Sequence, residues 1–224
     1  MTNNFSNKTS LIFEPLNIDF DENFNPKEIN EDYLLLKEIF TDPETMKTST
    51  FFACGTPETE LDLHLAMAAS TEAEKDFRKD YGLQKVWHVG LRQYIGVSGL
   101  IRRKEYATDK FIVEGLIFLK SEYLATGYGY WVMKYVFNKL EVLGGIMVAS
   151  AWEQNFPSIK LIQKNNMSFA GNSIKIYKGK EISIELYFKF SEGSKESGFL
   201  LPIHDIKQFL VFKKISTIPI KQAA

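Results

Sequence analysis

The 224-residue sequence contains few of the residues that build disulfide frameworks and metal sites. Its one cysteine, Cys54, has no partner for a disulfide within the chain, and a lone thiol among apolar neighbours is more often a packing residue than a nucleophile. The three histidines, His64, His88 and His204, are far apart and lack the paired spacing of metal ligands. We therefore expect a protein with no internal disulfide and no metal.

Long apolar runs and dense basic clusters are missing as well. No run is long enough to span a bilayer, and residues 1–10 lack the basic and apolar regions of a signal peptide. The densest basic cluster, residues 102–104, is too short to indicate nucleic-acid binding. These absences predict a cytoplasmic protein with no membrane span and no nucleic-acid partner.

Length and composition favour one domain followed by an extension. A chain of this size with 45% hydrophobic residues can bury a substantial core. Residues 191–198 are rich in Ser, Gly and charged residues, as is typical of a linker, and residues 199–220 are apolar with scattered lysines. We predict a domain over residues 1–190 and an extension over residues 191–224. The extension could cover a groove, mediate a dimer or bind a membrane surface, and packing on its own domain is the default expectation.

The formal net charge is −1, but the charges are unevenly distributed along the chain. Residues 14–80 contain 17 acidic and 6 basic residues, whereas residues 81–224 contain 11 acidic and 20 basic residues. Solvated helix faces account for most imbalances of this kind. The other interpretation is an acidic region that attracts a cationic ligand and a basic region that attracts an anionic one.

The most informative segment is a glycine-containing loop before an apolar helix. Residues 124–129 read Leu-Ala-Thr-Gly-Tyr-Gly, and residues 130–143 predict the helix. Gly127 and Gly129 let the backbone approach an anion, and the helix N-terminus offers it unpaired N–H groups. An ordinary strand-to-helix turn has the same composition. The loop lacks both the lysine of a P-loop and the G-x-G-x-x-G spacing of a dinucleotide site, so neither of those ligands is expected.

Regular elements are predicted on both sides of this loop. Residues 111–119 read as a buried strand that leads into it, and residues 146–151 read as a strand that follows the helix. Gly144 ends the helix between them. A second, short helix begins after Asn155 as N-cap and ends near residue 164, where Asn166 can adopt the left-handed conformation.

The rest of the chain adds helices and strands of the same domain. Residues 32–40 predict an amphipathic helix, and a longer helix, in which Leu61, Leu65 and Ala68 share a face, is expected to begin at residues 56–58. Two strand pairs are predicted, the first formed by residues 86–91 and 95–102 and the second by residues 174–178 and 182–190. This order of elements predicts a mixed sheet with helices on both faces.

Two spaced motifs resemble the GNAT superfamily of acyl-CoA N-acetyltransferases, in particular its ribosomal-protein N-terminal acetyltransferase branch. Residues 114–129 fit a pattern typical of that branch without a gap and share Glu114, Leu119, Glu122, Tyr123, Gly127 and Tyr128 with it. The later signature N-x-x-S-x-x-x-x-x-K-N-G-M appears here as Asn155, Ser158, Lys164, Asn165, Asn166 and Met167. The resemblance covers roughly residues 8–190, since residues 11–16 and 40–46 also resemble the start of the family's fold.

The resemblance implies an α+β fold of the GNAT type, with a mixed, mostly antiparallel sheet flanked by helices on both faces. It implies an N-acyltransferase that uses acetyl-CoA as co-substrate, needs no metal and acetylates a primary amine. In this family the N-terminal helices border the acceptor site and the C-terminal half binds CoA. The acidic residues 14–80 would then favour a cationic amine.

The resemblance also implies roles for individual residues. The pyrophosphate would lie on the loop, formed by Leu124, Ala125, Thr126, Gly127, Tyr128 and Gly129. Backbone N–H groups near Phe118 and Leu119 would bind the pantetheine and polarise the thioester carbonyl. Glu114 would be the general base, with a structural carboxylate as the equal alternative. Ser158 would hydrogen-bond the sulfur or protonate the thiolate, or else cap its helix, and Asn155 would bond the pantetheine amide or act as a cap.

Three departures from the family pattern bear on activity. Ala125 and Thr126 replace a Gly-Lys pair, and Leu124 stands where the family usually has Gln, Arg or Trp, so the loop has no side-chain cation. Ile162 occupies the turn where many relatives place a tyrosine as general acid. These changes keep a second hypothesis open, in which the chain is a non-catalytic acyl-CoA sensor with the same fold.

Overall fold

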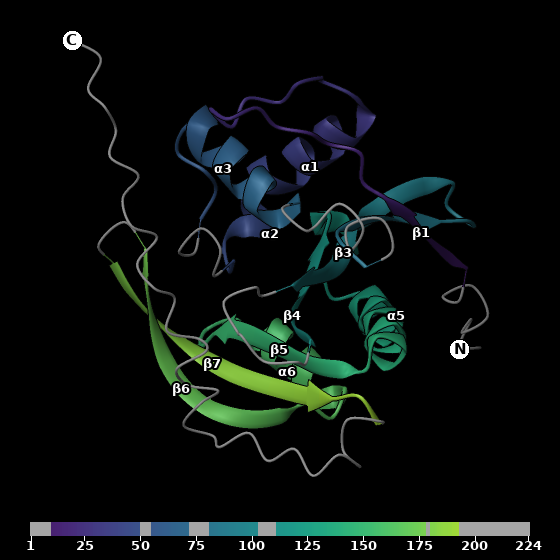
Figure 1. Cartoon of the computed structure of the whole chain (residues 1–224), viewed down its shortest axis with the longest axis vertical. Coiled ribbons are helices and arrows are strands. Elements are labelled where there is room, and N and C mark those ends of the chain that lie inside the picture. Colours follow the sequence, from purple (N-terminus) through teal and green to yellow (C-terminus); the bar gives the residue numbers. More distant parts are fainter. Residues whose placement is uncertain (1–9, 50–54, 72–80, 103–110, 178–179, 193–224) are drawn as a thin grey trace.

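The protein is described by a computed structural model over residues 10–49, 55–71, 81–102, 111–177 and 180–192 (Figure 1). The helices are α1 (Glu31–Thr41), α2 (Pro43–Met46), α3 (Glu60–Thr71), the 3-10 helix η2 (Ser121–Tyr123), α5 (Tyr128–Leu143) and α6 (Phe156–Lys164). The strands are β1 (Leu11–Pro15), β2 (Gln84–His88), β3 (Gln93–Arg102), β4 (Phe111–Leu119), β5 (Gly145–Trp152), β6 (Ser168–Tyr177) and β7 (Lys180–Phe190). The expectations for Cys54, His204, residues 103 and 104, and the extension beyond residue 192 lie outside the described residues.

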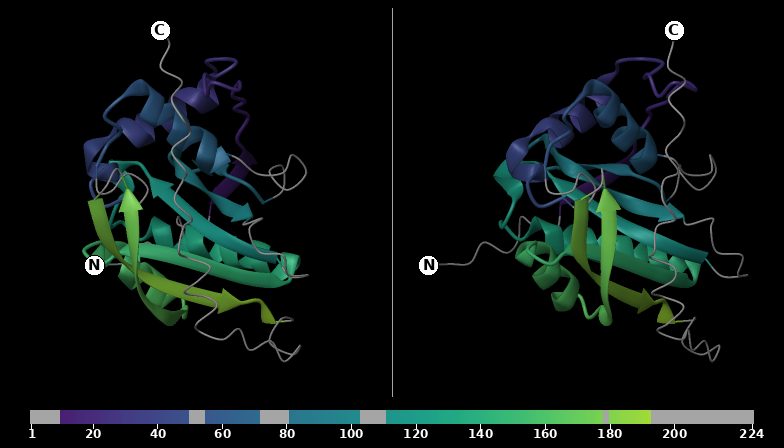
Figure 2. Two further views of the ribbon diagram at one scale, coloured as in Figure 1. Left: turned by 60° about the vertical axis from the view of Figure 1, so that its left-hand side comes forward. Right: turned by 90° about the vertical axis from the view of Figure 1, so that its left-hand side faces the viewer.

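The strands form one sheet in the order β1-β2-β3-β4-β5-β7-β6. Only β4 and β5 pair in parallel, and the other neighbours are antiparallel. The helices α1, α2 and α3 lie on one face of the sheet, and α5 and α6 lie on the other (Figures 1 and 2). The predicted fold class, a mostly antiparallel mixed sheet between two helical layers, is confirmed.

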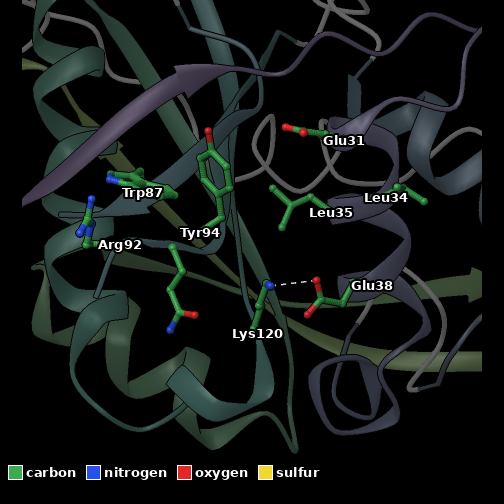
Figure 3. Close-up of a pocket in the computed structure, with 9 residues that line it drawn as sticks. Glu31, Leu34, Leu35, Glu38, Trp87, Arg92, Tyr94 and Lys120 are labelled. Atoms are coloured by element: carbon green, nitrogen blue, oxygen red, sulfur yellow. Dashed lines mark ion pairs between the residues drawn. The ribbon is translucent and has the colours of Figure 1, made fainter. Parts of the chain in front are cut away.

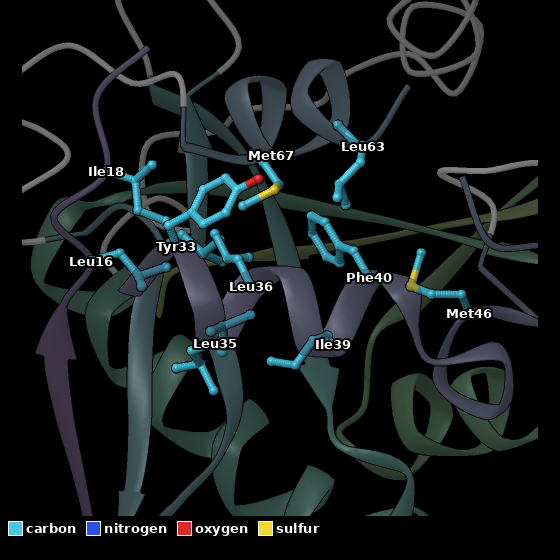
Figure 4. Close-up of a cluster of buried hydrophobic side chains, with 13 residues drawn as sticks. Leu16, Ile18, Tyr33, Leu35, Leu36, Ile39, Phe40, Met46, Leu63 and Met67 are labelled. Carbon is cyan, nitrogen blue, oxygen red and sulfur yellow. The ribbon is translucent and has the colours of Figure 1, made fainter. Parts of the chain in front are cut away.

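The first helical layer packs through α1 and α3 (Figure 4). α1 buries Leu36, Ile39 and Phe40 completely, as its amphipathic pattern predicts. The apolar face that Leu61, Leu65 and Ala68 share is not the buried face of α3, because Leu61 is 53% exposed while Leu63 and its i+3 and i+4 neighbours are buried. Apolar side chains occur on all sides of α3, so the hydrophobic pattern of its sequence does not determine which face is buried. The contacts with α1 determine it.

The second layer is built on α5. Val132, Val136 and Leu140 recur every four residues and are buried against the sheet. The helix begins at Tyr128, two residues earlier than predicted, and Gly129 therefore lies in its first turn. It ends as predicted at Gly144, which has φ +65° and donates its N–H to the carbonyl of residue 140.

Several boundaries differ from the predictions. α3 begins at Glu60, after the expected start at residues 56–58, and β2 covers Gln84–His88 where residues 86–91 were expected. β6 begins at Ser168, six residues before the predicted start, and a bulge between Phe169 and Gly171 interrupts its ladder with β7. Ser191 was expected to begin a linker, but it is buried and its N–H donates to the carbonyl of Gly145. The described chain therefore stays attached to the domain through residue 192.

Candidate functional site

The two central strands separate like the arms of a fork. β4 and β5 pair over only four residues, from Phe111 opposite Gly145 to Glu114 opposite Val148. Beyond that point β4 stays paired with β3 as far as Leu119, and β5 stays paired with β7. Residues 115–119 consequently have no strand opposite them on the β5 side in the described part of the sheet. Backbone groups there are available to a ligand that lies between the arms.

The register decides which backbone groups of β4 face the fork. The N–H of Lys120 donates to the carbonyl of Ile95 on β3 at 3.0 Å, and alternate residues of an antiparallel strand point their backbone groups to the same side. Phe118 therefore also bonds to β3, whereas Ile117 and Leu119 point their N–H and C=O groups toward the fork. This corrects the expectation for Phe118 and adds Ile117, whose place could not be derived without the register.

Glu114 lies at the base of the fork, in the last residue pair that joins β4 to β5. Its side chain is only 7% exposed, and the hydroxyl of Ser150 on β5 donates to its Oε1 at 3.4 Å. A buried carboxylate next to the point where two strands part can act as a proton acceptor for a group bound between them. The same contact would also serve a structural role.

The glycine loop has the backbone conformation of an anion-binding turn. Ala125 and Gly127 both have positive φ values, +58° and +92°, and Gly127 is the N-cap of α5 without any side-chain cap. The N–H groups of Gly127 and Gly129 make no hydrogen bond within the described part of the chain. The helix therefore presents unpaired amides and its positive dipole end at an exposed loop.

Two lysines outside the loop lie beside this helix end. Lys164, in the last turn of α6, has its Nζ 4.8 Å from the centre of the Tyr130 ring, and the Nζ of Lys134 is 5.1 Å from it. Tyr130 belongs to the first turn of α5, so both cations lie beside this end of the helix. Sequence reasoning missed this site for positive charge because it searched only the loop, although Lys164 belongs to the second motif.

α6, whose Leu161 lies beside Gly129 in the first turn of α5, has a closed N-terminus. Asn155 caps it by accepting the N–H of Ser158 at 3.1 Å, and the other end of its amide donates to the carbonyl of Thr48 at 3.0 Å. The hydroxyl of Ser158, on a half-buried residue, makes no hydrogen bond with the described residues. The capping role expected of Asn155 is confirmed, and its role toward a ligand stays a prediction.

α2 links the two arms of the fork. The hydroxyl of Thr45 lies 3.2 Å from the carbonyl oxygen of Leu119 at the end of β4, while Thr48 just after α2 accepts from Asn155 beyond β5. Asp42 caps α2, and although burial acts to raise the pKa of Asp42, hydrogen bonds from Ser121, Thr45 and Glu44 outweigh it and lower this pKa. α2 is thus fixed to both sides of the candidate site.

A groove of about 400 Å³ lies between α1 and the strands β2 and β3 (Figure 3). Its acidic residues, Glu31 and Glu38, are balanced by Arg92 and Lys120, and Lys120 pairs with Glu38 at 2.8 Å. Lys120 is six residues from Glu114 along an extended chain, a separation of roughly 20 Å. The groove is therefore neither acidic overall nor close to the candidate base.

The described residues contain neither a metal-binding cluster nor a membrane-spanning helix. Among the residues that the structure describes, no group of three His, Cys, Asp or Glu side chains could hold a metal ion. No helix in the same ranges is long and apolar enough to cross a membrane.

Comparison with known families and with curated proteins gives no match for this chain. Solved structures, in contrast, match its fold over most of its length. Spermidine N-acetyltransferase from Vibrio cholerae, in complex with CoA and spermine, aligns with a TM-score of 0.58 and 10% identity over 83% of this chain and 98% of that one. An N-acetyltransferase from Staphylococcus aureus Mu50 aligns with a TM-score of 0.57 and 15% identity over 80% and 98%.

A third similar structure is a GNAT superfamily phosphinothricin acetyltransferase from Sinorhizobium meliloti in complex with acetyl-CoA. It aligns with a TM-score of 0.54 and 18% identity over 71% of this chain and 85% of that one. The chain therefore has the fold of the GNAT acetyltransferases. Identities this low show a shared fold, and the activity has to be argued from the residues of this chain.

Proposed function

We propose that the chain is an N-acetyltransferase that transfers the acetyl group of acetyl-CoA to a primary amine by direct attack in a ternary complex. The acceptor is a protein N-terminus or a small-molecule amine. Membership of the ribosomal-protein branch rests on the two motifs alone, at residues 114–129 and 155–167.

One observation carries this proposal. The fork between β4 and β5 opens directly beside the uncapped N-terminus of α5, so a single ligand could place a pyrophosphate on the helix amides and an extended amide chain between the strands. Acetyl-CoA has these two parts in this order. Gly127 and Gly129 would hold the pyrophosphate with Lys164 beside it, and Ile117 and Leu119 would bond the pantetheine.

The chemistry follows from the charge states of the reactants. An ammonium group has no lone pair for attack on a thioester, so the amine must lose a proton, and Glu114 is the residue proposed to accept it, directly or through water. The amine nitrogen then bonds to the thioester carbon, and backbone N–H groups in the fork stabilise the oxyanion. The carbon–sulfur bond breaks as the carbonyl reforms. The nitrogen, which carries one extra proton after the attack, gives it to the departing thiolate, and Ser158 is proposed to hydrogen-bond the sulfur and relay this proton, so that the products are the amide and the CoA thiol.

The activity can be tested directly. Acetyl-CoA should raise the melting temperature of the protein, and thiol release with a panel of amines, followed by intact mass of the acceptor, should identify the product. The panel should contain peptides with free N-termini, amino acids, polyamines and aminated antibiotics. Stabilisation without turnover over the whole panel would reject the enzyme and favour the sensor.

The general base has a separate test. Glu114→Gln should leave CoA binding intact and lower turnover roughly a hundredfold, the usual contribution of a positioned base, with the acidic limb of the pH–rate profile altered. Glu181→Gln, which changes an exposed glutamate at the start of β7, is the matched control. A decrease of less than a few-fold in the Glu114 variant would leave this residue with the structural role only.

The acceptor is proposed to be a cationic amine, because residues 14–80 carry the acidic excess. Screening shortens to about 8 Å at physiological ionic strength, so the rate constant at limiting acceptor should fall as salt rises, with CoA held saturating. A preference for neutral or anionic acceptors, or a rate independent of salt, would reject this substrate class and leave acetyl transfer untouched.

The second candidate function is an acyl-CoA sensor. Two observations favour it: the loop has no cation of its own, and Ile162 is buried in the core at the turn where relatives place the acid tyrosine. Lys164 and Ser158 argue against the sensor. Lys164 offers a cation beside the start of α5, and Ser158 offers a hydroxyl on α6, the helix that carries Ile162.

A further inference from the structure

The end of the β2–β3 hairpin contacts the start of α5 through a buried histidine. His88, the last residue of β2, is 2% exposed, and its Nδ1 accepts the N–H of Leu91 at 3.0 Å. In the neutral ring the proton is therefore on Nε2, which lies 2.9 Å from the hydroxyl oxygen of Tyr128 and donates to it. The two rings also pack edge to face, with their centres 5.1 Å apart.

A second contact joins the same hairpin end to the other end of the loop. Gln93, which pairs with His88 across the hairpin, donates from its side-chain amide to the hydroxyl of Tyr123. The carbonyl of Tyr123 accepts the hydroxyl of Thr126 at 2.6 Å. Tyr128 is the first residue of α5, so the exposed loop is held at both ends by residues from one hairpin.

We propose that His88 is a positioning residue for the acetyl-CoA loop, a role that rests on the proposed function. It holds Tyr128 in place, so the free amides of Gly127 and Gly129 already point at the pyrophosphate before it binds. Without this hydrogen bond a loop with two glycines would lose more conformational entropy on binding, which weakens affinity for the ligand without changing the reacting groups.

Three substitutions separate the contacts of His88. Tyr128→Phe removes the hydroxyl and keeps the ring. His88→Asn places an oxygen near the position of Nδ1, so it can still accept from Leu91 but no longer reaches Tyr128. His88→Gln places its amide near the position of Nε2 and can still donate to Tyr128. Tyr135→Phe is the matched control, because Tyr135 lies two turns along the same face of α5 and donates to Gln84 of β2 at 2.9 Å.

The expected result is specific to the pyrophosphate. Tyr128→Phe and His88→Asn should each raise the dissociation constant of CoA roughly fivefold by calorimetry, the effect of one hydrogen bond, and the double variant should be no weaker than either. His88→Gln should restore most of the affinity, and Tyr135→Phe should leave it unchanged. In the His88 variants, the turnover number at saturating acetyl-CoA and the kcat/KM for acetyl-pantetheine, which lacks the pyrophosphate, should not change.

Amide hydrogen exchange of the free protein tests the positioning without any ligand. Residues 124–130 should exchange faster in Tyr128→Phe and His88→Asn than in the wild type or in Tyr135→Phe. Unchanged exchange there in both variants overturns the proposal, as does an equal loss of kcat/KM for acetyl-pantetheine. Faster exchange in a protein whose wild type fails to bind CoA would support the positioning role and reject the proposed function.

Discussion

α5 and α6 pack against each other, yet the backbone amides of their first turns have different hydrogen-bond partners. A side chain added at Gly129 in the first turn of α5 would come within 3.3 Å of Leu161, in the second half of α6, so the start of α5 packs against α6. α6 is closed by Asn155, which accepts a backbone N–H and also reaches Thr48. α5 has no side-chain cap and leaves the amides of its glycines unpaired.

The difference shows that local sequence sets which helix end can bind a ligand. A capped end has its amides satisfied by its own chain, so it contributes to stability, whereas an uncapped and exposed end costs the protein that stabilisation and is open to an anion. α2 resembles α6, because Asp42 closes it. Around the fork, the end of α5 is therefore the one suited to bind a phosphate group.

The largest effect on CoA affinity is expected from blocking the exposed N-terminus of α5. Gly127→Val places a β-branched residue at φ +92°, where it is strained, and adds methyl groups where the anion must approach. The dissociation constant of CoA should rise by roughly a hundredfold, which corresponds to about 3 kcal/mol or one to two charge-assisted hydrogen bonds. Calorimetry on the folded variant measures it.

The control for this substitution lies at the other end of the same helix. Gly144 also has a positive φ, +65°, and an added side chain would meet nothing within 4 Å. Gly144→Val should destabilise the protein through the same backbone strain, by about 1–2 kcal/mol, while CoA binding stays at the wild-type level. An equal loss of CoA affinity in both variants would attribute the effect to strain and would remove the pyrophosphate from this loop.

The next largest effect, on the free energy of unfolding, is expected from removing the N-cap of α6. Asn155→Ala removes the cap and the contact with Thr48, so it should lower the free energy of unfolding by about 1–2 kcal/mol in urea denaturation. Asn155→Asp keeps the accepting oxygen and should recover the part of the lost stability that is due to the cap hydrogen bond. A large loss of CoA affinity in Asn155→Asp, at near wild-type stability, would instead show that the Asn155 amide binds the pantetheine.

The sequence predicted the elements around the fork well, because each carries local signals. β4 matches its predicted bounds, Asn155 caps α6, and Asn166 has φ +57° as expected at the end of that helix. Such features depend on a few neighbouring residues, namely apolar runs, caps and residues that tolerate positive φ.

The features that sequence reasoning missed depend on contacts between distant segments. The direction of the Phe118 amide follows from the register with β3, which no local pattern specifies. The partner of Tyr128 is His88, 40 residues earlier, and Lys164 reaches α5 only through the packing of α6. His88 was rejected as a metal ligand and expected to be an ordinary structural residue, so its role as a hydrogen-bond donor to Tyr128 was not predicted.

A smaller effect is expected from the carboxylate cap of α2. The folded-state pKa of Asp42 is lowered, so its stabilising contribution is complete above the unfolded value of about 3.9 and is lost as pH falls through the lowered pKa. Asp42→Asn retains a capping oxygen without this titration. Urea denaturation between pH 6 and 3 should therefore show the wild type losing stability relative to the variant below about pH 4. A constant difference over this range would contradict the ionised cap.

The smallest effect is expected from relieving strain within the α5 loop itself. Ala125 has φ +58°, a conformation that costs an alanine about 1 kcal/mol, and glycine adopts it freely. Ala125→Gly also makes the unfolded chain more flexible, which offsets much of that gain, so the net stabilisation should be about 0.5 kcal/mol or less. Asn166→Gly tests the same conformation at the end of α6, where asparagine is less strained, so its gain in stability should be smaller.

The melting temperature should therefore rise slightly for Ala125→Gly and remain nearly constant for Asn166→Gly, with CoA affinity unchanged in both. A fall in unfolding free energy of more than about 1 kcal/mol for Ala125→Gly would mean that this residue does not adopt the left-handed conformation in the free protein, and the shape of the open helix end would have to be reassigned.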